Sequence, residues 1–330
     1  MRRVRVATYN VLSSALCDAA GTYGFARCNA VDLDGERRFA RLERKLAAQM
    51  ELGAVLALQE ISREWLARLL PFWEARGYAH AASLSGSART GHMGQCTAWP
   101  RERFELRDVE LPRIGAKMAG YREEVHAASG SWKEALSRHN CATMVRLRPR
   151  DDPAERDLCF ANYHMPCAFG SDERCQVVVA HAALLVQFAQ RWAGRDALVV
   201  LGDFNFDPRS AAYDLVVRGA IGAEHAQRPP PAPWAPDWDP TVQPMRSAYA
   251  EALGREPEFT NFAHTGYVGV APSEPFCETL DYIFLSPQWS VADVEALPSK
   301  ASLVTDRLAS YPSADQPSDH LLLSAELALA

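Results

Sequence analysis

Short apolar runs alternate with longer amphipathic stretches along almost the entire chain. The short runs consist mainly of aliphatic and aromatic residues and have the length of buried strands. The strands are expected at Val4–Tyr9, Ala54–Gln59, Gln95–Trp99, Ala142–Leu147, Leu158–Tyr163, Ala197–Leu201, Leu280–Leu285 and Leu321–Leu327. Because strands that alternate with helices form sheets covered by helices, the pattern predicts an α/β fold.

Three amphipathic stretches have the spacing and the start signals of helices. They are expected at Glu36–Leu52, Ser62–Arg76 and Ser171–Trp192. In the first, apolar side chains recur from Phe39 to Met50 at intervals of three or four residues. The second and the third begin with serine, which is a common N-cap residue. We expect these helices to cover the outer faces of the strands.

The composition changes at two places. Residues Arg148–Arg156 are charged and include two prolines, which predicts the loop of a hairpin. Gln227–Pro244 contains seven prolines and is too rich in proline for regular structure. This second stretch is compatible with a linker between domains, but residues of chemical interest lie on both sides of it. We therefore expect a single domain over residues 1–330, with a surface loop at 227–244.

Composition and charge limit the kinds of partner. The 330 residues are 48% hydrophobic and 23% charged, as in globular proteins with a sizeable core. No apolar run approaches the roughly 20 residues that cross a bilayer, and the first residues lack the apolar core of a secretory signal. We therefore expect no membrane partner and a cytoplasmic or nuclear location, not secretion. With a net charge of −6, the chain would have to bind any nucleic acid at a local site.

Polar residues stand at the ends of several expected strands, where α/β folds usually assemble their sites. Asn10 ends the first strand, although a turn asparagine would explain this position equally well. Glu60 closes the apolar run Ala54–Gln59, where an unpaired carboxylate is costly to bury. The alternative for Glu60 is a helix cap for Ser62–Arg76.

The most specific of these segments is Gly202-Asp203-Phe204-Asn205. Asp203 and Asn205 alternate along an extended segment, so their side chains are expected to point the same way. This places a proton acceptor beside a hydrogen-bond donor, which suits the positioning of a nucleophile against a phosphate. The alternative is that both residues only shape the turn before Pro208.

Two further segments accompany the last strands. Asp281 stands near the start of the apolar run Leu280–Leu285, and Asp319 and His320 precede the run Leu321–Leu327. An imidazole with carboxylates nearby can be held charged or in one tautomer. An isolated Asp-His pair would otherwise be an ordinary surface turn.

Taken together, the order Asn, Glu, Asp-x-Asn, Asp and Asp-His, each at a strand edge, resembles the exonuclease–endonuclease–phosphatase superfamily. The resemblance runs from Thr8 to Leu323, and its most specific parts are Gly-Asp-Phe-Asn and Pro-Ser-Asp-His. It implies a four-layer αββα sandwich of two mixed β-sheets, the DNase-like fold, with the site at one rim.

The resemblance also implies a metal site. Glu60 would be the principal ligand of Mg²⁺, with Mn²⁺ as the alternative ion. Asn10 would lie nearby, and Asp319 would reach the same ion or a second one. Hard oxygen ligands suit these ions and do not favour zinc.

For catalysis, the resemblance implies four roles. Asp203 would orient or deprotonate the attacking water, and Asn205 would hold a phosphate oxygen. His320 would contact the scissile phosphate, while Asp281 would bond the far nitrogen of its ring and fix its orientation. Together with the metal ion, these groups would neutralise the charge of a pentacoordinate transition state.

Within the superfamily, the chain resembles most the branch of the poly(A) deadenylases and nocturnin-like proteins. Asn162-Tyr163-His164-Met165 is similar to the Asn-x-His-Met/Leu segment of that branch. The similarity implies that His164 contacts phosphate and that Asn162 belongs to the substrate-binding residues. The alternative for His164 is a strand-end histidine bonded to a loop.

The resemblance to the same branch also implies which residues bind the substrate. Arg246–Tyr249 and Phe259–Phe262 resemble the deadenylase stretch that holds a terminal adenine through an asparagine and a stacking aromatic. Asn261 would be that asparagine, and Tyr267 is the nearest candidate for the aromatic. Asn140 falls where the deadenylases place an asparagine near the active site.

The resemblance therefore implies a Mg²⁺-dependent phosphodiester hydrolase, with a 3′–5′ exoribonuclease of deadenylase type acting on adenine-rich RNA as the favoured activity. One departure lies at Gly91–Cys96, where the aspartate of the branch's Asp-Gly-Cys-Ala motif is absent. A phosphatase or phosphodiesterase for a nucleotide or small phosphoester, and an abasic-site or DNase-type endonuclease, stay open as alternatives. The non-enzymatic alternative is an inactive protein that keeps the fold and binds RNA or a protein partner. The complete set of site residues favours activity.

Overall fold

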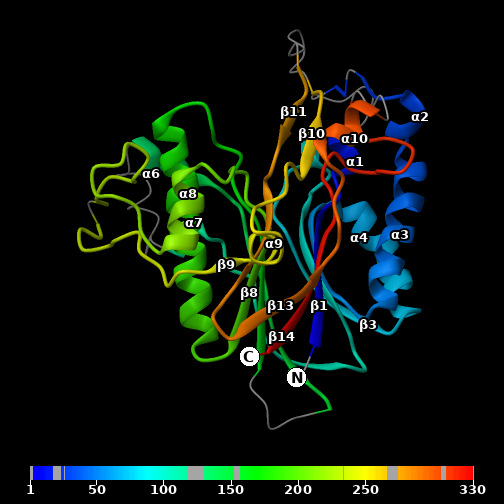
Figure 1. The fold of residues 1–330 in the computed structure, drawn as a ribbon, viewed down its shortest axis with the longest axis horizontal. Coiled ribbons are helices and arrows are strands. Elements are labelled where there is room, and N and C mark those ends of the chain that lie inside the picture. Colours follow the sequence, from blue (N-terminus) through cyan, green and yellow to red (C-terminus); the bar gives the residue numbers. More distant parts are fainter. Residues whose placement is uncertain are drawn as a thin grey trace.

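The computed structural model describes residues 3–17, 24–25, 27–117, 130–151, 157–232, 234–265, 274–305 and 310–329. Two mixed six-stranded sheets pack face to face (Figure 1). In order of pairing, the first sheet consists of β13 (Trp289–Val294), β14 (Leu323–Leu329), β1 (Arg3–Asn10), β2 (Val55–Ile61), β4 (Gly94–Pro100) and β3 (Tyr78–Leu84). The second consists of β5 (Phe104–Glu110), β6 (Thr143–Pro149), β7 (Leu158–His164), β8 (Ala197–Asp203), β12 (Asp281–Leu285) and β9 (Arg246–Ser247). A separate antiparallel pair is formed by β10 (Asn261–Ala263) and β11 (Phe276–Glu278).

Helices cover the outer face of each sheet (Figure 1). The first sheet is covered by α3 (Gly35–Glu51) and α4 (Arg63–Glu74), and the second by α6 (Gly130–Ser137), α7 (Asp172–Ala193) and α8 (Ala211–Arg218). The shorter helices are α1 (Ser14–Cys17), α2 (Ala30–Leu33), α9 (Ala248–Leu253) and α10 (Lys300–Thr305), with 3₁₀ turns η1 (Ala88–Thr90) and η2 (Gly115–Lys117). These layers confirm the expected αββα sandwich.

The inner core joins the two sheets. Val6 and Val55 of the first sheet lie in one buried cluster with Val145 and Val199 of the second. Strands that are covered on both faces carry continuous apolar runs. All eight strands expected from such runs are present, with ends that differ by no more than two residues. The three expected helices correspond to α3, α4 and α7.

The proline-rich stretch 227–244 packs along α7. Gln187 on α7 donates from Nε2 to the carbonyl oxygens of Asp239 and Thr241, at 2.8 and 2.9 Å. The Trp132 indole on α6 donates to the Pro230 carbonyl oxygen at 2.7 Å. Pro233 lies outside the described residues. The stretch therefore lies against the helical layer of the second sheet.

The other segment of unusual composition, 148–156, joins two strands that pair with each other. β6 and β7 are antiparallel neighbours, as the predicted hairpin requires, and residues 152–156 lie outside the described part. In the ranges that the structure describes, no helix has both the length and the apolar character needed to cross a membrane.

A buried histidine on α7 makes the helical layer sensitive to acid. His181 Nδ1 lies 2.7 Å from the Tyr163 hydroxyl oxygen, and its Nε2 lies 2.9 Å from the Ala135 carbonyl oxygen. Because a carbonyl oxygen only accepts, Nε2 carries the hydrogen and Nδ1 accepts from the hydroxyl. The imidazole is therefore satisfied while neutral, and burial lowers the pKa of His181 to about 4.

This arrangement predicts a loss of stability on acidification. Between about pH 6.5 and pH 4 the unfolded chain binds a proton at His181 that the folded chain does not, so the free energy of unfolding falls by up to about 1.4 kcal/mol per pH unit. Denaturant unfolding of the parent, His181→Gln and the exposed control His139→Gln should show a shallower acid dependence in His181→Gln alone. Parallel pH profiles for all three proteins would contradict the prediction.

Candidate active site

The register of the strands brings several strand ends together at one rim of the sandwich. In the first sheet β1 and β2 are parallel, and Asn10 pairs with the residue that precedes Glu60. In the second sheet β7 and β8 are parallel, and His164 pairs with Asp203. Asp281 at the start of β12 pairs with Asp203 from the other side. Because parallel neighbours end at the same edge, these side chains are close in space although they are far apart in sequence.

Glu60 stands at a bulge of β2. The pairing with β4 shifts by one residue between Leu58 and Ile61, and Glu60 has a φ of 55°, in the left-handed region. Such a conformation costs roughly 1–3 kcal/mol in a non-glycine residue and often occurs at functional sites. Ser62 caps α4 instead, since its Oγ accepts from the Trp65 N–H at 3.1 Å. The helix-cap alternative for Glu60 is therefore wrong.

The Asn10 side-chain amide joins the two sheets at this rim. Its Nδ2 donates to Glu60 Oε1 at 3.0 Å and to Asp203 Oδ2 at 2.9 Å. Its Oδ1 accepts from the Leu12 N–H at 3.0 Å, and the Ser13 N–H donates to Glu60 Oε2 at 3.3 Å. Neutral donors thus hold both carboxylates in place without cancelling their charge.

The carboxylates and one imidazole form a cluster that can hold a metal ion. Glu60, His164 and Asp203 each offer one ligand atom, and these atoms lie within 4.8 Å of one another. His164 Nε2 is 3.4 Å from Asp203 Oδ2 and 4.0 Å from Glu60 Oε1. Across the described ranges, no lysine or arginine forms an ion pair with either carboxylate. Two adjacent carboxylates repel each other, so a divalent ion with a preference for oxygen ligands fits beside Glu60 and Asp203.

His320 lies on the other side of Asp203. Its Nδ1 is 2.8 Å from Asp281 Oδ2, and the Thr260 hydroxyl donates to the same carboxylate oxygen at 2.6 Å. Its Nε2 is 3.5 Å from Asn10 Nδ2 and 3.7 Å from Asp203 Oδ2. Asp281 therefore fixes the ring and leaves Nε2 turned toward the cluster.

The charge of His320 follows from competing effects. Burial disfavours the charged imidazole, but the carboxylates of Asp281, Asp203 and Asp319 outweigh it and raise the pKa of His320 well above its usual range. Burial also raises the pKa of Asp281, to about 6, against the lowering effect of His320. At neutral pH we therefore expect a charged imidazole paired with an ionised Asp281.

Asp319 and Asn205 border the cluster. Asp319 Oδ2 accepts from Asn261 Nδ2 at 3.3 Å. Two groups of side chains have ligand atoms within 4.8 Å of one another, and Asp319 belongs to neither of them: Glu60, His164 and Asp203, and Asp203, Asp281 and His320. The role of Asp319 as a metal ligand stays a prediction. Asn205, with a φ of 49°, donates from its backbone N–H to Asp203 Oδ1 at 3.0 Å and from Nδ2 to the Met165 carbonyl oxygen at 2.9 Å. An amide nitrogen carries two hydrogens, so one remains for a ligand.

The family follows from a match that spans this whole arrangement. The profile of the Endonuclease/Exonuclease/phosphatase family matches residues 7–320, from β1 to His320. The chain belongs to this family. The resemblance seen in the sequence is thereby confirmed.

Curated relatives of this family member come from its deadenylase-like branch. The 2',5'-phosphodiesterase 12 of Homo sapiens is 26% identical over 342 residues, covering 98% of this chain and 51% of that protein. The Carbon catabolite repressor protein 4 homolog 4 of Arabidopsis thaliana is 28% identical over 247 residues, covering 68% of this chain and 53% of that protein. The Nocturnin of Drosophila melanogaster is 22% identical over 342 residues, covering 99% and 47%. The chain thus spans about half the length of the curated relatives it matches.

Solved structures of the family share the fold. The crystal structure of ANGEL2, a 2',3'-cyclic phosphatase, in complex with adenosine-2',3'-vanadate, has a TM-score of 0.75 and 20% identity, covering 99% of this chain and 96% of that one. The human Nocturnin catalytic domain with bound sulfate has a TM-score of 0.65 and 19% identity, covering 99% and 95%. These likenesses confirm the sandwich architecture.

One residue that was predicted to bind substrate lies away from the rim of the sandwich where the carboxylates and imidazoles meet. Asn162 is completely buried between the sheets. Its Nδ2 donates to the carbonyl oxygens of Leu58 and Cys96, at 3.1 and 3.0 Å, and its Oδ1 accepts from Gln59 Nε2 at 2.7 Å. The structure therefore does not bring Asn162 to the substrate side; the residue ties the sheets together beneath the cluster.

The remaining predicted contacts differ in their positions. Asn140 donates from Nδ2 to the His164 carbonyl oxygen at 2.8 Å, so it supports His164 from behind. Asn261 is buried beside Asp319, as described above. Tyr267 lies outside the described residues, so its stacking role stays a prediction.

Arg38 is a site-supporting residue that the sequence analysis did not single out. From α3 its Nη2 donates to the carbonyl oxygens of Val11, at 3.0 Å, and Leu12, and its Nε donates to the Pro317 carbonyl oxygen at 2.7 Å. This fully buried guanidinium fastens the segment after β1 to the segment before His320. The sequence pattern could have identified Arg38, because this residue lies in line with the apolar positions of α3. A charged side chain on a buried helix face needs buried partners.

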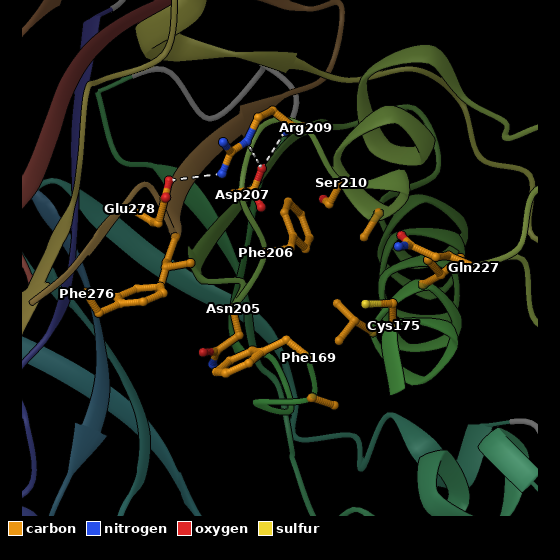
Figure 2. A pocket seen from close by; sticks show the side chains of 15 residues that line it. Phe169, Cys175, Asn205, Phe206, Asp207, Arg209, Ser210, Gln227, Phe276 and Glu278 are labelled. Atoms are coloured by element: carbon orange, nitrogen blue, oxygen red, sulfur yellow. Dashed lines mark hydrogen bonds and ion pairs between the residues drawn. The ribbon is translucent and has the colours of Figure 1, made fainter. Parts of the chain in front are cut away.

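A pocket with a volume of about 270 Å³ opens beside Asn205 (Figure 2). Phe169, in the segment after β7, and Phe276, on β11, line it and expose 52% and 41% of their surface. Exposed aromatic rings beside a polar site are suited to stack on a flat ligand. Neither ring was predicted from the sequence to belong to the site. The signal for Phe276 was its place on the segment that leads into Asp281.

Proposed function

We propose that this chain is a divalent-metal-dependent phosphodiesterase that removes nucleotides from the 3′ end of RNA, with a preference for adenine. The observation that supports it most is the pocket with two exposed phenylalanines beside Asn205, which borders the carboxylate and imidazole cluster. Stacking of a base on an aromatic ring contributes roughly 1–3 kcal/mol. That contribution offsets the lack of a basic surface in a chain with a net charge of −6.

The cluster has the parts that phosphoester hydrolysis needs. The Asp203 carboxylate, fixed by Asn10 and by the Asn205 N–H, accepts the proton of the attacking water. The charged His320, held by Asp281, donates from Nε2 to a phosphate oxygen on which negative charge builds up.

Glu60 would be the principal ligand of the metal ion, for which Mg²⁺ or Mn²⁺ is proposed, and the ligand atoms of Asp203 and His164 lie within 4.8 Å of its own. When bound, the ion supplies positive charge that polarises the phosphoryl group. The bulge at Glu60 and the amide of Asn10 keep the two carboxylates ready for it.

The test is a time course on 5′-labelled RNA that ends in a run of adenosines, with Mg²⁺ or with EDTA. The proposal expects a ladder that shortens from the 3′ end, depends on the metal and is lost in Asp203→Asn. RNA that stays intact with Mg²⁺ and with Mn²⁺ would overturn it. Abasic DNA and free nucleotides would then be the next substrates, and inactivity on all of them would favour an inactive binding protein.

A second candidate is hydrolysis of 2′,5′-linked adenosine oligonucleotides, because several curated relatives are named 2',5'-phosphodiesterase 12. The same base pocket would serve both linkages. Tetra-adenylates of equal length with 3′,5′ or 2′,5′ linkages separate the two candidates. A kcat/KM that is higher for the 2′,5′ substrate would favour this second activity.

A further inference from the structure

We infer that Glu278, paired with Arg209, which Asp207 holds in turn, selects the base in the pocket beside Asn205. The selected base is one with an exocyclic amino group, and a base with a carbonyl group at the same edge is rejected. This inference rests on the proposed function, because it names the residue that would decide the base preference of that activity.

The alternation of β11 places Glu278 and a stacking ring on one side. Phe276 and Glu278 are separated by one residue, so their side chains leave the strand on the same face, and both line the pocket (Figure 2). A base stacked on Phe276 would therefore present an edge toward the Glu278 carboxylate. The backbone of Glu278 is also fixed, since its carbonyl oxygen accepts from the Thr260 N–H at 3.0 Å.

Arg209, in the segment between β8 and α8, pairs with the Glu278 carboxylate. Its Nη2 lies 3.3 Å from Glu278 Oε2, and its Nε donates to Asp207 Oδ1 at 2.9 Å (Figure 2). An ionised carboxylate accepts about four hydrogen bonds. The ion pair therefore orients Glu278 and leaves acceptor capacity for an amino group.

The charged residues that line the pocket disfavour a phosphate or a carbonyl group as its ligand. Asp207 and Glu278 are the acidic residues that line the pocket, and Arg209 is its one cation among the residues that the structure describes. A phosphate would meet two carboxylates against one guanidinium, so the balance disfavours an anion. A carbonyl oxygen would be repelled in the same way, whereas an amino group is a donor that a carboxylate accepts.

The experiment compares three short RNAs that differ only in the terminal base: adenine, hypoxanthine, which has a carbonyl group in place of the amino group, and unsubstituted purine, which has neither. For the parent protein we expect kcat/KM to fall about 10-fold from adenine to hypoxanthine, mainly through KM, with purine between them. Glu278→Gln should bring adenine and hypoxanthine within about twofold, because an amide can donate to a carbonyl. Glu74→Gln, in an exposed arginine–glutamate pair outside this pocket, should keep the parent's preference.

Two results would overturn the inference. The first is equal cleavage of adenine and hypoxanthine ends by an active parent protein. The second is an unchanged preference in an active Glu278→Gln variant. Both leave the proposed hydrolysis of RNA from its 3′ end intact, whereas a parent protein that cleaves none of the three RNAs with Mg²⁺ present would overturn the proposed function and this inference together.

Discussion

The Glu60→Gln variant should lose at least about 10²-fold in kcat/KM while it folds as well as the parent. The amide keeps the size of the side chain and one of its two acceptor oxygens, enough for the Asn10 amide, but removes the charge that would bind a metal ion. It also relieves the repulsion from Asp203, whose Oδ2 shares the Asn10 amide with Glu60. The metal-free variant should therefore melt at the same temperature as the metal-free parent, or higher.

Thermal unfolding with increasing Mg²⁺ checks the same prediction without any substrate. A ligand that binds the folded state raises the melting temperature, so the parent should be stabilised and Glu60→Gln should not. Glu64→Gln is the matched control, since Glu64 lies four residues further along and is exposed on α4. Parent-like activity in Glu60→Gln would remove Glu60 from the metal site.

The second large effect is expected at the pair of Asp281 and His320. His320→Ala removes the proposed donor to the phosphate and should lower kcat by about 10²–10³-fold. Asp281→Asn should lower it to a similar extent, because the amide cannot hold the imidazole charged and can turn a donor toward Nδ1. If the two residues act as one unit, the double variant should be little worse than either single variant.

Steady-state kcat of both single variants and the double variant tests this, with His139→Ala as the exposed control. Losses that multiply in the double variant would mean that the two residues act independently. Denaturant unfolding of the same proteins is needed alongside, since Asp281→Asn leaves Thr260 and His320 in a buried site with an altered partner. A kinetic loss in variants that stay folded is the expected outcome.

The strands that could be predicted from the sequence are those that lie inside the sheets. β1, β7 and β8 have neighbours on both sides and a helical layer or second sheet on each face, so their sequences are continuously apolar. The strands at the four sheet edges, β3, β13, β5 and β9, were not predicted. β3 is mostly half-buried and β5 is mostly exposed; both carry mixed residues, and β9 has two residues. Their positions come from pairing with a neighbour, which a local pattern does not contain.

The residues of the candidate site also differ in how well the sequence predicts their positions. Asn10, Glu60 and Asp203 end buried strands, so apolar runs pointed to them, and the family resemblance supplied their roles. Asn162 and His164 show the limit of a motif, because they lie on the same face of β7 but at different depths. His164 stands at the rim, whereas Asn162, two residues deeper, faces the other sheet and bonds to it.

The contacts of the buried Arg38 affect the order in which parts of the molecule fold. One of its acceptors, the Val11 carbonyl oxygen, is 27 residues away in the chain, and another, the Pro317 carbonyl oxygen, is 279 residues away. Contacts of such sequence separation form late in folding because a long loop must close first. During refolding from denaturant, circular dichroism should therefore recover before turnover does. A population that has regained its helices would still include molecules in which β14 has not paired with β1 and His320 does not yet lie beside Asn10.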